Sequence, residues 1–139
     1  GSDREPTPSD RARDEKELPM KYMIMMFSGM GASLVDRSPE WITEIQTTMM
    51  RMDRELRQAG EVIESRHLTD PTQATTVRFV DGAPAPTDGP FAEIKESLAG
   101  YWVIEGSYER AVEIASQVVA VTEFPMEVRR IMDEPPTDM

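Results

Sequence analysis

The stretch Lys21-Tyr22-Met23-Ile24-Met25-Met26-Phe27-Ser28 is a nearly continuous apolar run, and it ends at Gly29-Met30-Gly31. Its length is that of a β-strand. Apolar and polar residues do not alternate along it, which indicates a strand buried on both faces. The rest of the chain must therefore supply a covering layer for each face of the sheet that contains this strand.

A long amphipathic helix follows. Ser38-Pro39-Glu40 is typical of a helix start, because Ser is a preferred N-cap, Pro is tolerated at the first helical position and Glu suits the positive end of the dipole. Gly60 after Ala59 provides a residue suited to the left-handed C-cap conformation. The pattern predicts a helix over 38–59 with one apolar stripe, formed by Trp41, Ile45, Met49, Met52 and Leu56.

Three extended segments come next. Residues 61–69 and the β-branched segment 75–80 are each predicted to be strands, and Asp81-Gly82 is a two-residue hairpin signal. The returning segment 83–87 contains Pro84 and Pro86, which lack amide donors. It is therefore predicted to be an edge strand or an irregular arm.

The second half repeats the alternation of strand and helix. Residues 93–98 are compatible with a short helical turn, and residues 100–106 form an apolar segment between glycines that predicts a strand. Ser107 is predicted to cap a second helix, and residues 126–131 alternate as a final strand. The buried face of this helix is expected to contain Ala111, Ile114, Ala115 and Val118.

The order of elements is β-α-β, a hairpin, and β-α-β again. This order predicts the α+β class, as a ferredoxin-like split βαβ sandwich with a β-hairpin insertion. Two helices can cover only one face of such a sheet, so side chains from 23–27 and 101–104 would be displayed on the other. We therefore predict a homodimer in which two copies pack face to face through an isologous interface, with methionines tolerating an imperfect fit.

Composition limits the class of protein. The 139 residues predict one domain over 20–132, with a disordered tail over 1–19 and a flexible tail over 133–139. The net charge of −11 disfavours direct binding to nucleic acid or anionic lipid. There is no Cys, no apolar run long enough for a membrane span and no signal-peptide pattern, so a cytoplasmic location is the expectation.

The segment 87–96, with sequence Thr-Asp-Gly-Pro-Phe-Ala-Glu-Ile-Lys-Glu, is the strongest candidate for a functional loop. Asp88-Gly89-Pro90-Phe91 is either a simple tight turn or a stiff loop that holds a carboxylate at the mouth of a cavity, able to bind a ligand or move a proton. Glu93, Lys95 and Glu96 are either a solvated charged turn or further ligand contacts. One His and no Cys give no indication of a metal site, and no cofactor motif is present.

His67 is the only histidine in the chain, near the end of the second predicted strand. It is either a structural or exposed strand residue, or a general base oriented by Asp88 or another acid. In the catalytic alternative, Asp88 acts as the base, and Lys95 or Tyr101 positions the substrate.

The segment 87–96 followed by Gly100-Tyr101 resembles the signature of the DGPF proteins, a branch of the YCII-related superfamily. The segments 21–23, 56–60 and 74–78 are similar to the family pattern, with Ile94 where Thr is more usual. The resemblance covers about 20–132. It implies a ferredoxin-like, dimeric α+β barrel with a pocket near the signature loop, in a largely uncharacterised family.

This sequence departs from the family pattern on the first helix, and the resemblance also implies a partner protein. In YCII-type relatives, a His on the first helix pairs with an acid near the end of that helix. Here Gln46 and Gln58 occupy roughly those places, and neither amide can act as an acid or a base. Genes for DGPF proteins often lie beside those for extracytoplasmic-function sigma factors, which implies a regulatory association.

Three functional hypotheses follow. The first is a homodimer that binds a small ligand beside Asp88, with or without proton transfer. The second is a non-catalytic regulatory module that contacts a sigma factor through its charged loop or its tails. The third is an inert protein whose pocket is filled by Phe91 and Trp102.

Overall fold

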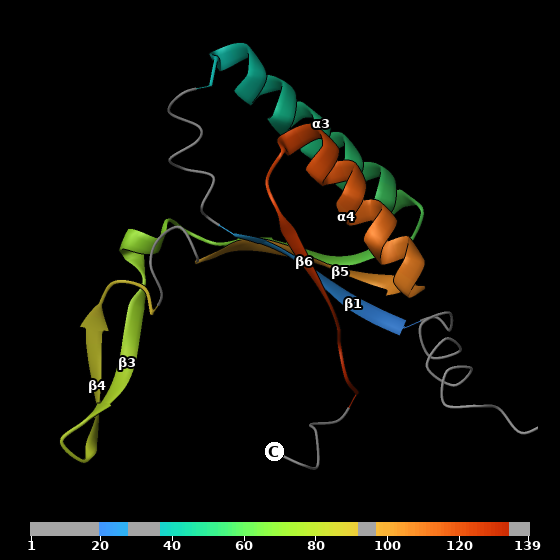
Figure 1. Ribbon diagram of the computed structural model, residues 1–139. Coiled ribbons are helices and arrows are strands. Elements are labelled where there is room, and N and C mark those ends of the chain that lie inside the picture. Colours follow the sequence, from blue (N-terminus) through green and yellow to red (C-terminus); the bar gives the residue numbers. More distant parts are fainter. Residues whose placement is uncertain (1–19, 28–36, 92–96, 134–139) are drawn as a thin grey trace, which may run out of the picture.

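The computed structural model describes residues 20–27, 37–91 and 97–133 (Figure 1). The expected tail over 1–19, residues 93–96 of the predicted helical turn, and residues 134–139 lie outside this description. The elements, in chain order, are β1 (Met20–Phe27), α3 (Pro39–Gln58), β2 (Val62–His67), the 3-10 helix η1 (Pro71–Gln73), β3 (Thr75–Val80), β4 (Ala83–Asp88), β5 (Leu98–Gly106), α4 (Tyr108–Thr122) and β6 (Met126–Arg130).

Four strands form one sheet in the order β2-β5-β1-β6, and every neighbouring pair is antiparallel. Both α3 and α4 lie on the same side of this sheet (Figure 1). The predicted α+β class is therefore confirmed, as is the expectation that two helices cover only one face. The boundaries agree with expectation to within two residues, and the largest differences are that β2 ends at His67 rather than at Thr69 and that β5 begins at Leu98 rather than at Gly100.

The helix ends follow the sequence signals. The hydroxyl of Ser38 accepts a hydrogen bond from the amide of Trp41 at 3.1 Å, and that of Ser107 accepts from the amide of Arg110 at 3.0 Å. Gly60, just after the C-cap of α3, has a φ of 76°. At the end of α4 the left-handed position is taken by Glu123, with a φ of 64°, where no glycine is available.

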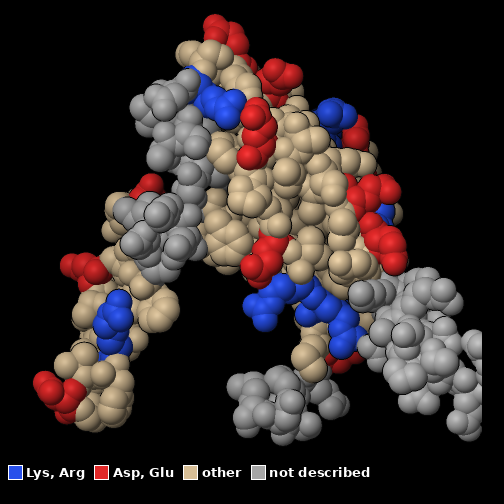
Figure 2. Space-filling model, viewed as in Figure 1, with Lys and Arg blue, Asp and Glu red and all other residues tan. Residues whose placement is uncertain are grey.

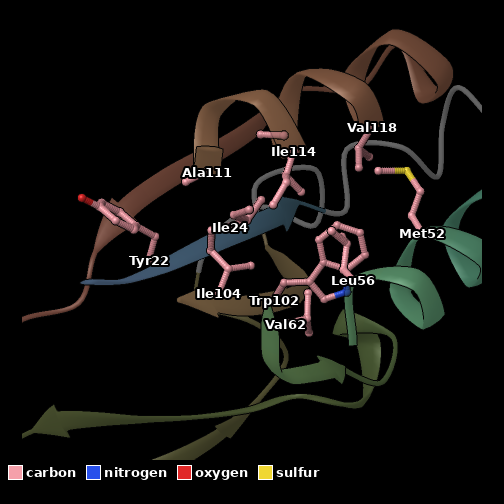
Figure 3. Packing of buried hydrophobic residues seen from close by; sticks show 11 residues of the cluster. Tyr22, Ile24, Met52, Leu56, Val62, Trp102, Ile104, Ala111, Ile114 and Val118 are labelled. Atoms are coloured by element: carbon pink, nitrogen blue, oxygen red, sulfur yellow. The ribbon is translucent and has the colours of Figure 1, made fainter. Parts of the chain in front are cut away.

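The core lies between the two helices and the covered face of the sheet (Figure 3). Ile24, Ile104, Ile114 and Val118 are fully buried, and Trp102 lies among them with only 5% of its surface exposed. The buried cluster consists of Tyr22, Ile24, Met52, Leu56, Val62, Trp102, Ile104, Ala111, Ile114, Ala115 and Val118. It contains all four predicted α4 positions, and of the predicted α3 stripe it contains Met52 and Leu56.

The opposite face of the sheet, which we call the open face, is less exposed than the sequence suggests. The strand register places Met23, Met25, Tyr101 and Val103 there, because their neighbours Ile24 and Trp102 face the helices. Met25 is 9% exposed and Val103 is 7% exposed within the single chain. Side chains paired across β1 and β5, such as Met23 with Val103, cover one another and leave a smaller apolar area than expected.

β3 and β4 form a separate two-stranded hairpin. Asp81 and Gly82 connect them with φ values of 51° and 81°, which confirms the predicted hairpin turn. Pro84 pairs with Phe79 and Pro86 pairs with Val77. The hairpin projects from the sheet on the side away from the helices (Figure 1).

An ion pair ties the start of α4 to the segment before β2. Two nitrogens of the Arg110 guanidinium donate to the Glu61 carboxylate, at 2.6 and 3.1 Å. These bonds lower the pKa of Glu61 and raise that of Arg110.

Among the described residues, neither α3 nor α4 combines the length and apolar character that a membrane-spanning helix requires.

Candidate functional site

The most prominent candidate site lies between α3 and the end of the sheet. It is an open cavity of about 570 Å³, which we call the α3–sheet cavity. Its lining combines five apolar side chains with four polar ones: Met26, Ile45, Gln46, Met49, Met50, Asp53, His67, Trp102 and Thr122. These residues come from three strands and both helices, so the cavity depends on the whole fold rather than on one loop.

The floor of the site is one row of residues across the sheet. His67 of β2 pairs with Gly100 of β5, Gly100 pairs with Met26 of β1, and Met26 pairs with Met126 of β6. Because neighbouring strands lie about 4.8 Å apart, His67 and Met26 face each other across roughly 10 Å with no side chain between them. A smaller cavity of about 100 Å³ lies over this row and shares Met26, Met49, His67 and Trp102 with the larger one.

Gly100 is required at its position by close contact. A methyl group placed on it would lie 2.8 Å from the backbone oxygen of Arg66 and 3.5 Å from Nδ1 of His67. The first distance is shorter than any ordinary van der Waals contact, and backbone cannot move as a side chain does. The imidazole of His67 therefore lies next to the gap that Gly100 leaves in the row.

Asp53 holds the indole ring that forms part of the wall. The indole Nε1–H of Trp102 donates to Oδ1 of Asp53 at 3.0 Å, and Nε of Arg57 donates to Oδ2 at 3.0 Å. Both carboxylate oxygens thus have partners, and the negative charge is balanced by the guanidinium four residues later on α3. We assign Asp53 a positioning role, since its hydrogen bonds fix the ring of Trp102.

His67 is differently placed, because its side chain is exposed and lines both cavities. In the part of the chain that the structure describes, the imidazole makes no hydrogen bond or ion pair. Histidine can donate or accept a hydrogen bond. Thioether, indole and aliphatic surfaces around one such group make a site suited to a small apolar molecule with a single polar substituent.

The predicted residue Asp88 lies elsewhere. It ends β4, pairs with Thr75 across the hairpin and is exposed, and it does not line either cavity described above. The structure therefore brings His67, but not Asp88, to the α3–sheet cavity. In the described part of the chain, no hydrogen bond reaches the Asp88 carboxylate.

The loop after Asp88 is anchored by its backbone. Gly89 has a φ of 102°, its amide donates to the carbonyl of Ala74 at 2.8 Å, and its carbonyl accepts from the hydroxyl of Thr76 at 2.7 Å. Pro90 is half-buried, whereas Phe91 is exposed and lies 5.5 Å from the guanidinium of Arg78. These contacts correspond to the tight-turn alternative for Asp88-Gly89-Pro90-Phe91.

The other predicted ligand contacts divide into two groups. Tyr101 is among the residues that line the smaller cavity, although the register directs its side chain to the open face, away from the side of the sheet on which His67 lies. Glu93, Lys95 and Glu96 lie outside the described residues. Of the two amides at the places of the YCII-type pair, Gln46 lines the α3–sheet cavity and Gln58 is the last residue of α3. The described residues contain no cluster of three or more His, Asp or Glu that could hold a metal ion.

The sequence analysis did not identify Asp53, and it assigned Met49 and Trp102 no ligand contact. A signal was available for Asp53, because it follows Met49 by four residues and so borders the apolar stripe of α3. Its bond to Trp102 joins residues 49 positions apart and has no local signature.

Comparison with known proteins identifies a family. The chain is 34% identical over 80 residues to a protein of Rhizobium meliloti (strain 1021) described as uncharacterized protein R00369. That match covers 54% of this chain and 64% of the relative, so the chain spans somewhat less than two thirds of its length. The family model of the YCII-related domain matches residues 20–135. The resemblance read from the loop and its neighbouring segments is thereby confirmed, and the chain belongs to the YCII-related family.

Proposed function

We propose that this chain binds a small, largely apolar organic molecule in the α3–sheet cavity, with His67 as its hydrogen-bonding contact. The observation that carries the proposal is the lining, in which the unpartnered imidazole of His67 stands among methionine, isoleucine and tryptophan side chains, with Gln46 and Thr122 as further polar groups. Asp53 does not compete for the ligand's polar group, because Trp102 and Arg57 already occupy its carboxylate oxygens.

The catalytic form of the proposal is a proton transfer by His67, with Asp88 as the predicted acid–base partner. What supports His67 is its place in the cavity; Asp88 enters from the sequence pattern alone. The two variants His67→Gln and Asp88→Asn separate these contributions. If ligand binding is weakened in His67→Gln but not in Asp88→Asn, the binding site is limited to the cavity. If it is weakened in both variants, the binding site also includes the hairpin loop.

A matched pair of probes tests the proposal. Naphthalene and 2-naphthol have the same aromatic body and differ by one hydroxyl, and their affinities can be compared by isothermal titration calorimetry. We expect 2-naphthol to bind the wild-type chain about 5- to 10-fold more tightly than naphthalene, the effect of one hydrogen bond of about 1 kcal/mol. In His67→Phe, whose ring cannot hydrogen-bond, this preference should vanish while naphthalene binding persists.

Trp102 gives an independent readout. The chain has two tryptophans, and Trp102 lines the cavity whereas Trp41 does not. In a Trp41→Phe variant, the fluorescence of Trp102 should change on adding 2-naphthol with the same midpoint as in calorimetry. Absence of any heat or fluorescence change at saturating probe concentrations contradicts the proposed binding site.

We also propose that the chain forms a homodimer through the open face, as a ferredoxin-like, dimeric α+β barrel. The strand order β2-β5-β1-β6, with two helices on one face, supports this arrangement. A hollow of about 540 Å³ lies on the open face beside Met23, Val103 and the exposed Ile63. Isologous packing would cover Met23 and Ile63, which the single chain leaves partly exposed.

The charges of the open face support self-association. The strand register places three cationic and three anionic residues there, so the face is neutral although the whole chain carries −11: Lys21, Arg66, Arg129, Glu64, Glu105 and Glu127. Two copies related by a two-fold axis can then place opposite charges against each other. Sedimentation velocity at micromolar concentration should show a dimer, and a stable monomer would overturn this part of the proposal.

A further inference from the structure

We infer that the β3–β4 hairpin is a clasp, whose apolar face packs on a second copy of this chain when the open faces associate. This inference rests on the proposed homodimer and names a further part of its interface. Apolar side chains of the hairpin are much more exposed than apolar side chains of the open face. Phe79 is 78% exposed and Val77 is 64% exposed, whereas Met25 and Val103 on the open face are almost covered.

The exposed residues of the hairpin form one face. Val77 and Phe79 are separated by one residue on β3, so they point to the same side, and their cross-strand partners are Pro86 and Pro84. The four residues of this clasp face (Val77, Phe79, Pro84 and Pro86) are uncharged, and the next pair on the same side, Thr75 with Asp88, places one carboxylate at the end away from the turn. An isolated two-stranded hairpin is marginally stable in water, and an uncharged face of this kind is stabilised when another surface covers it.

The direction of the hairpin indicates which surface covers the clasp face. It projects on the side of the sheet away from α3 and α4, and a hollow lies between it and the body of the molecule (Figures 1 and 2). A molecule that docks on the open face therefore lies beside the hairpin. A second copy docked there by a two-fold axis also offers its own hairpin, so one association covers both clasp faces.

Charge favours a second copy as the occupant. The turn of the hairpin carries Asp81, whose charge favours contact with a cation on the surface that it meets. Basic side chains gather along the lower edge of the body, beside the hollow (Figure 2). Lys21 and Arg129, which the register places on the open face, provide cations that an acidic turn from another copy can approach.

The test compares two sides of the same hairpin. Val77→Ser/Phe79→Ser removes the apolar side chains of the clasp face, and Val80→Ser is the matched control because Val80 is exposed on the other side. Dimer dissociation is measured by sedimentation velocity over a dilution series. We expect the double variant to raise the dimer Kd by about 30-fold or more and the control to change it by less than about 3-fold.

Two failures are distinguishable. If the wild-type chain is a monomer, the homodimer itself is wrong and the clasp falls with it. If the wild type is a dimer and the double variant dissociates no more readily than Val80→Ser, the homodimer stands and the clasp is wrong. Far-UV circular dichroism should show that both variants keep the folded body, since β3 and β4 belong to a separate sheet.

Cross-linking gives a second, positive measurement. The chain contains no cysteine, so Asp81→Cys provides a single attachment point for benzophenone-4-maleimide. Mixing ¹⁵N-labelled and unlabelled chains before irradiation separates links between copies from links within one copy by mass. We expect links between copies to reach peptides that contain β1 or β6. Links confined to a single copy, or an unlinked dimer, contradict the clasp.

Discussion

The indole N–H of Trp102 donates a hydrogen bond to the carboxylate of Asp53, 3.0 Å away, and thereby joins the middle of β5 to α3. A ring in the core and a carboxylate on a helix surface thus share one bond at the wall of the candidate site. The ring is almost fully buried, so removal of Asp53 leaves its N–H without a hydrogen-bond partner at the wall of the cavity.

The first prediction concerns this pair. Asp53→Ala should lower the free energy of unfolding by about 1–3 kcal/mol, because it leaves a buried donor unsatisfied. A double-mutant cycle with Trp102→Phe, measured by urea unfolding, should give a coupling energy of about 1 kcal/mol. Additive effects of the two substitutions would show that the bond does not stabilise the fold.

Gly100→Ala tests the contact under His67. The added methyl group would lie 2.8 Å from the backbone oxygen of Arg66, so β2 must move away from β5. We expect a loss of about 1–3 kcal/mol in unfolding free energy and weaker binding of 2-naphthol. Gly106→Ala is the matched control on the same strand, because nothing lies within 4 Å of its added methyl group. Equal stability of the two variants would contradict this account.

The pair of Glu61 and Arg110 predicts a pH dependence. Hydrogen bonds from Arg110 lower the pKa of Glu61 in the folded state, so the carboxylate stabilises the fold at pH values above its ordinary pKa of about 4.3. This stabilisation is lost as the pH falls through the lowered pKa. Glu61→Gln should therefore cost about 1 kcal/mol at pH 7, and the difference from the wild type should shrink toward zero below about pH 4.

Glu44→Gln provides the control for that titration, since Glu44 is exposed on α3 and makes no ion pair in the described part of the chain. The unfolding free energy of this variant should match that of the wild type at pH 7 and at pH 3.5. A Glu61→Gln effect that is the same at pH 7 and pH 3.5 would mean that the side chain acts through its shape rather than its charge.

Tyr22 carries a buried hydroxyl that has no hydrogen-bond partner among the described residues. Burial raises the pKa of this phenol, so it is neutral at ordinary pH. Because an unpaired buried hydroxyl costs free energy, Tyr22→Phe should leave the unfolding free energy unchanged or raise it by up to about 1 kcal/mol. The nearby Ile24→Val, expected to cost about 1 kcal/mol, shows that the assay can resolve such changes. A clear loss in Tyr22→Phe would reveal a partner for the hydroxyl.

Asp88→Asn should leave the melting temperature within about 2 °C of the wild type. The amide and carbonyl of Gly89 hold this turn, and neither bond uses the Asp88 carboxylate. Gly89→Ala should lower stability by about 1 kcal/mol, because its φ of 102° is strained for any residue with a side chain. Differential scanning calorimetry distinguishes these cases, and a large drop in Asp88→Asn would assign the carboxylate to the turn itself.

Local signals in the sequence were sufficient to predict the order of elements. Ser38 and Ser107 marked the helix starts, Gly60 the end of α3, and Asp81-Gly82 the hairpin turn, because each acts within a few residues of itself. The spacing of Met52 and Leu56 similarly predicted the face of α3 that is buried.

The cavity could not be predicted in the same way. Its floor depends on the register that aligns His67, Gly100 and Met26 across three strands, and its wall depends on a bond between α3 and β5. Neither arrangement leaves a pattern within one segment. The sequence analysis therefore placed the candidate site at the loop around Asp88, where several polar and charged residues are close together in sequence. The α3–sheet cavity is instead lined by residues of α3, α4 and three strands of the sheet.

Pro84 and Pro86 bear on how far copies of this chain can assemble. A strand at the rim of a sheet normally offers a ladder of amide donors, which can template the next chain and so begin a fibre. β4 lacks two of these donors, so its outer rim cannot extend the hairpin into a longer ladder. Of the two rims of this arm, only that of β3 is free of proline, so strand addition cannot continue through the hairpin from one copy to the next, which favours a closed assembly with a fixed number of copies over open-ended aggregation.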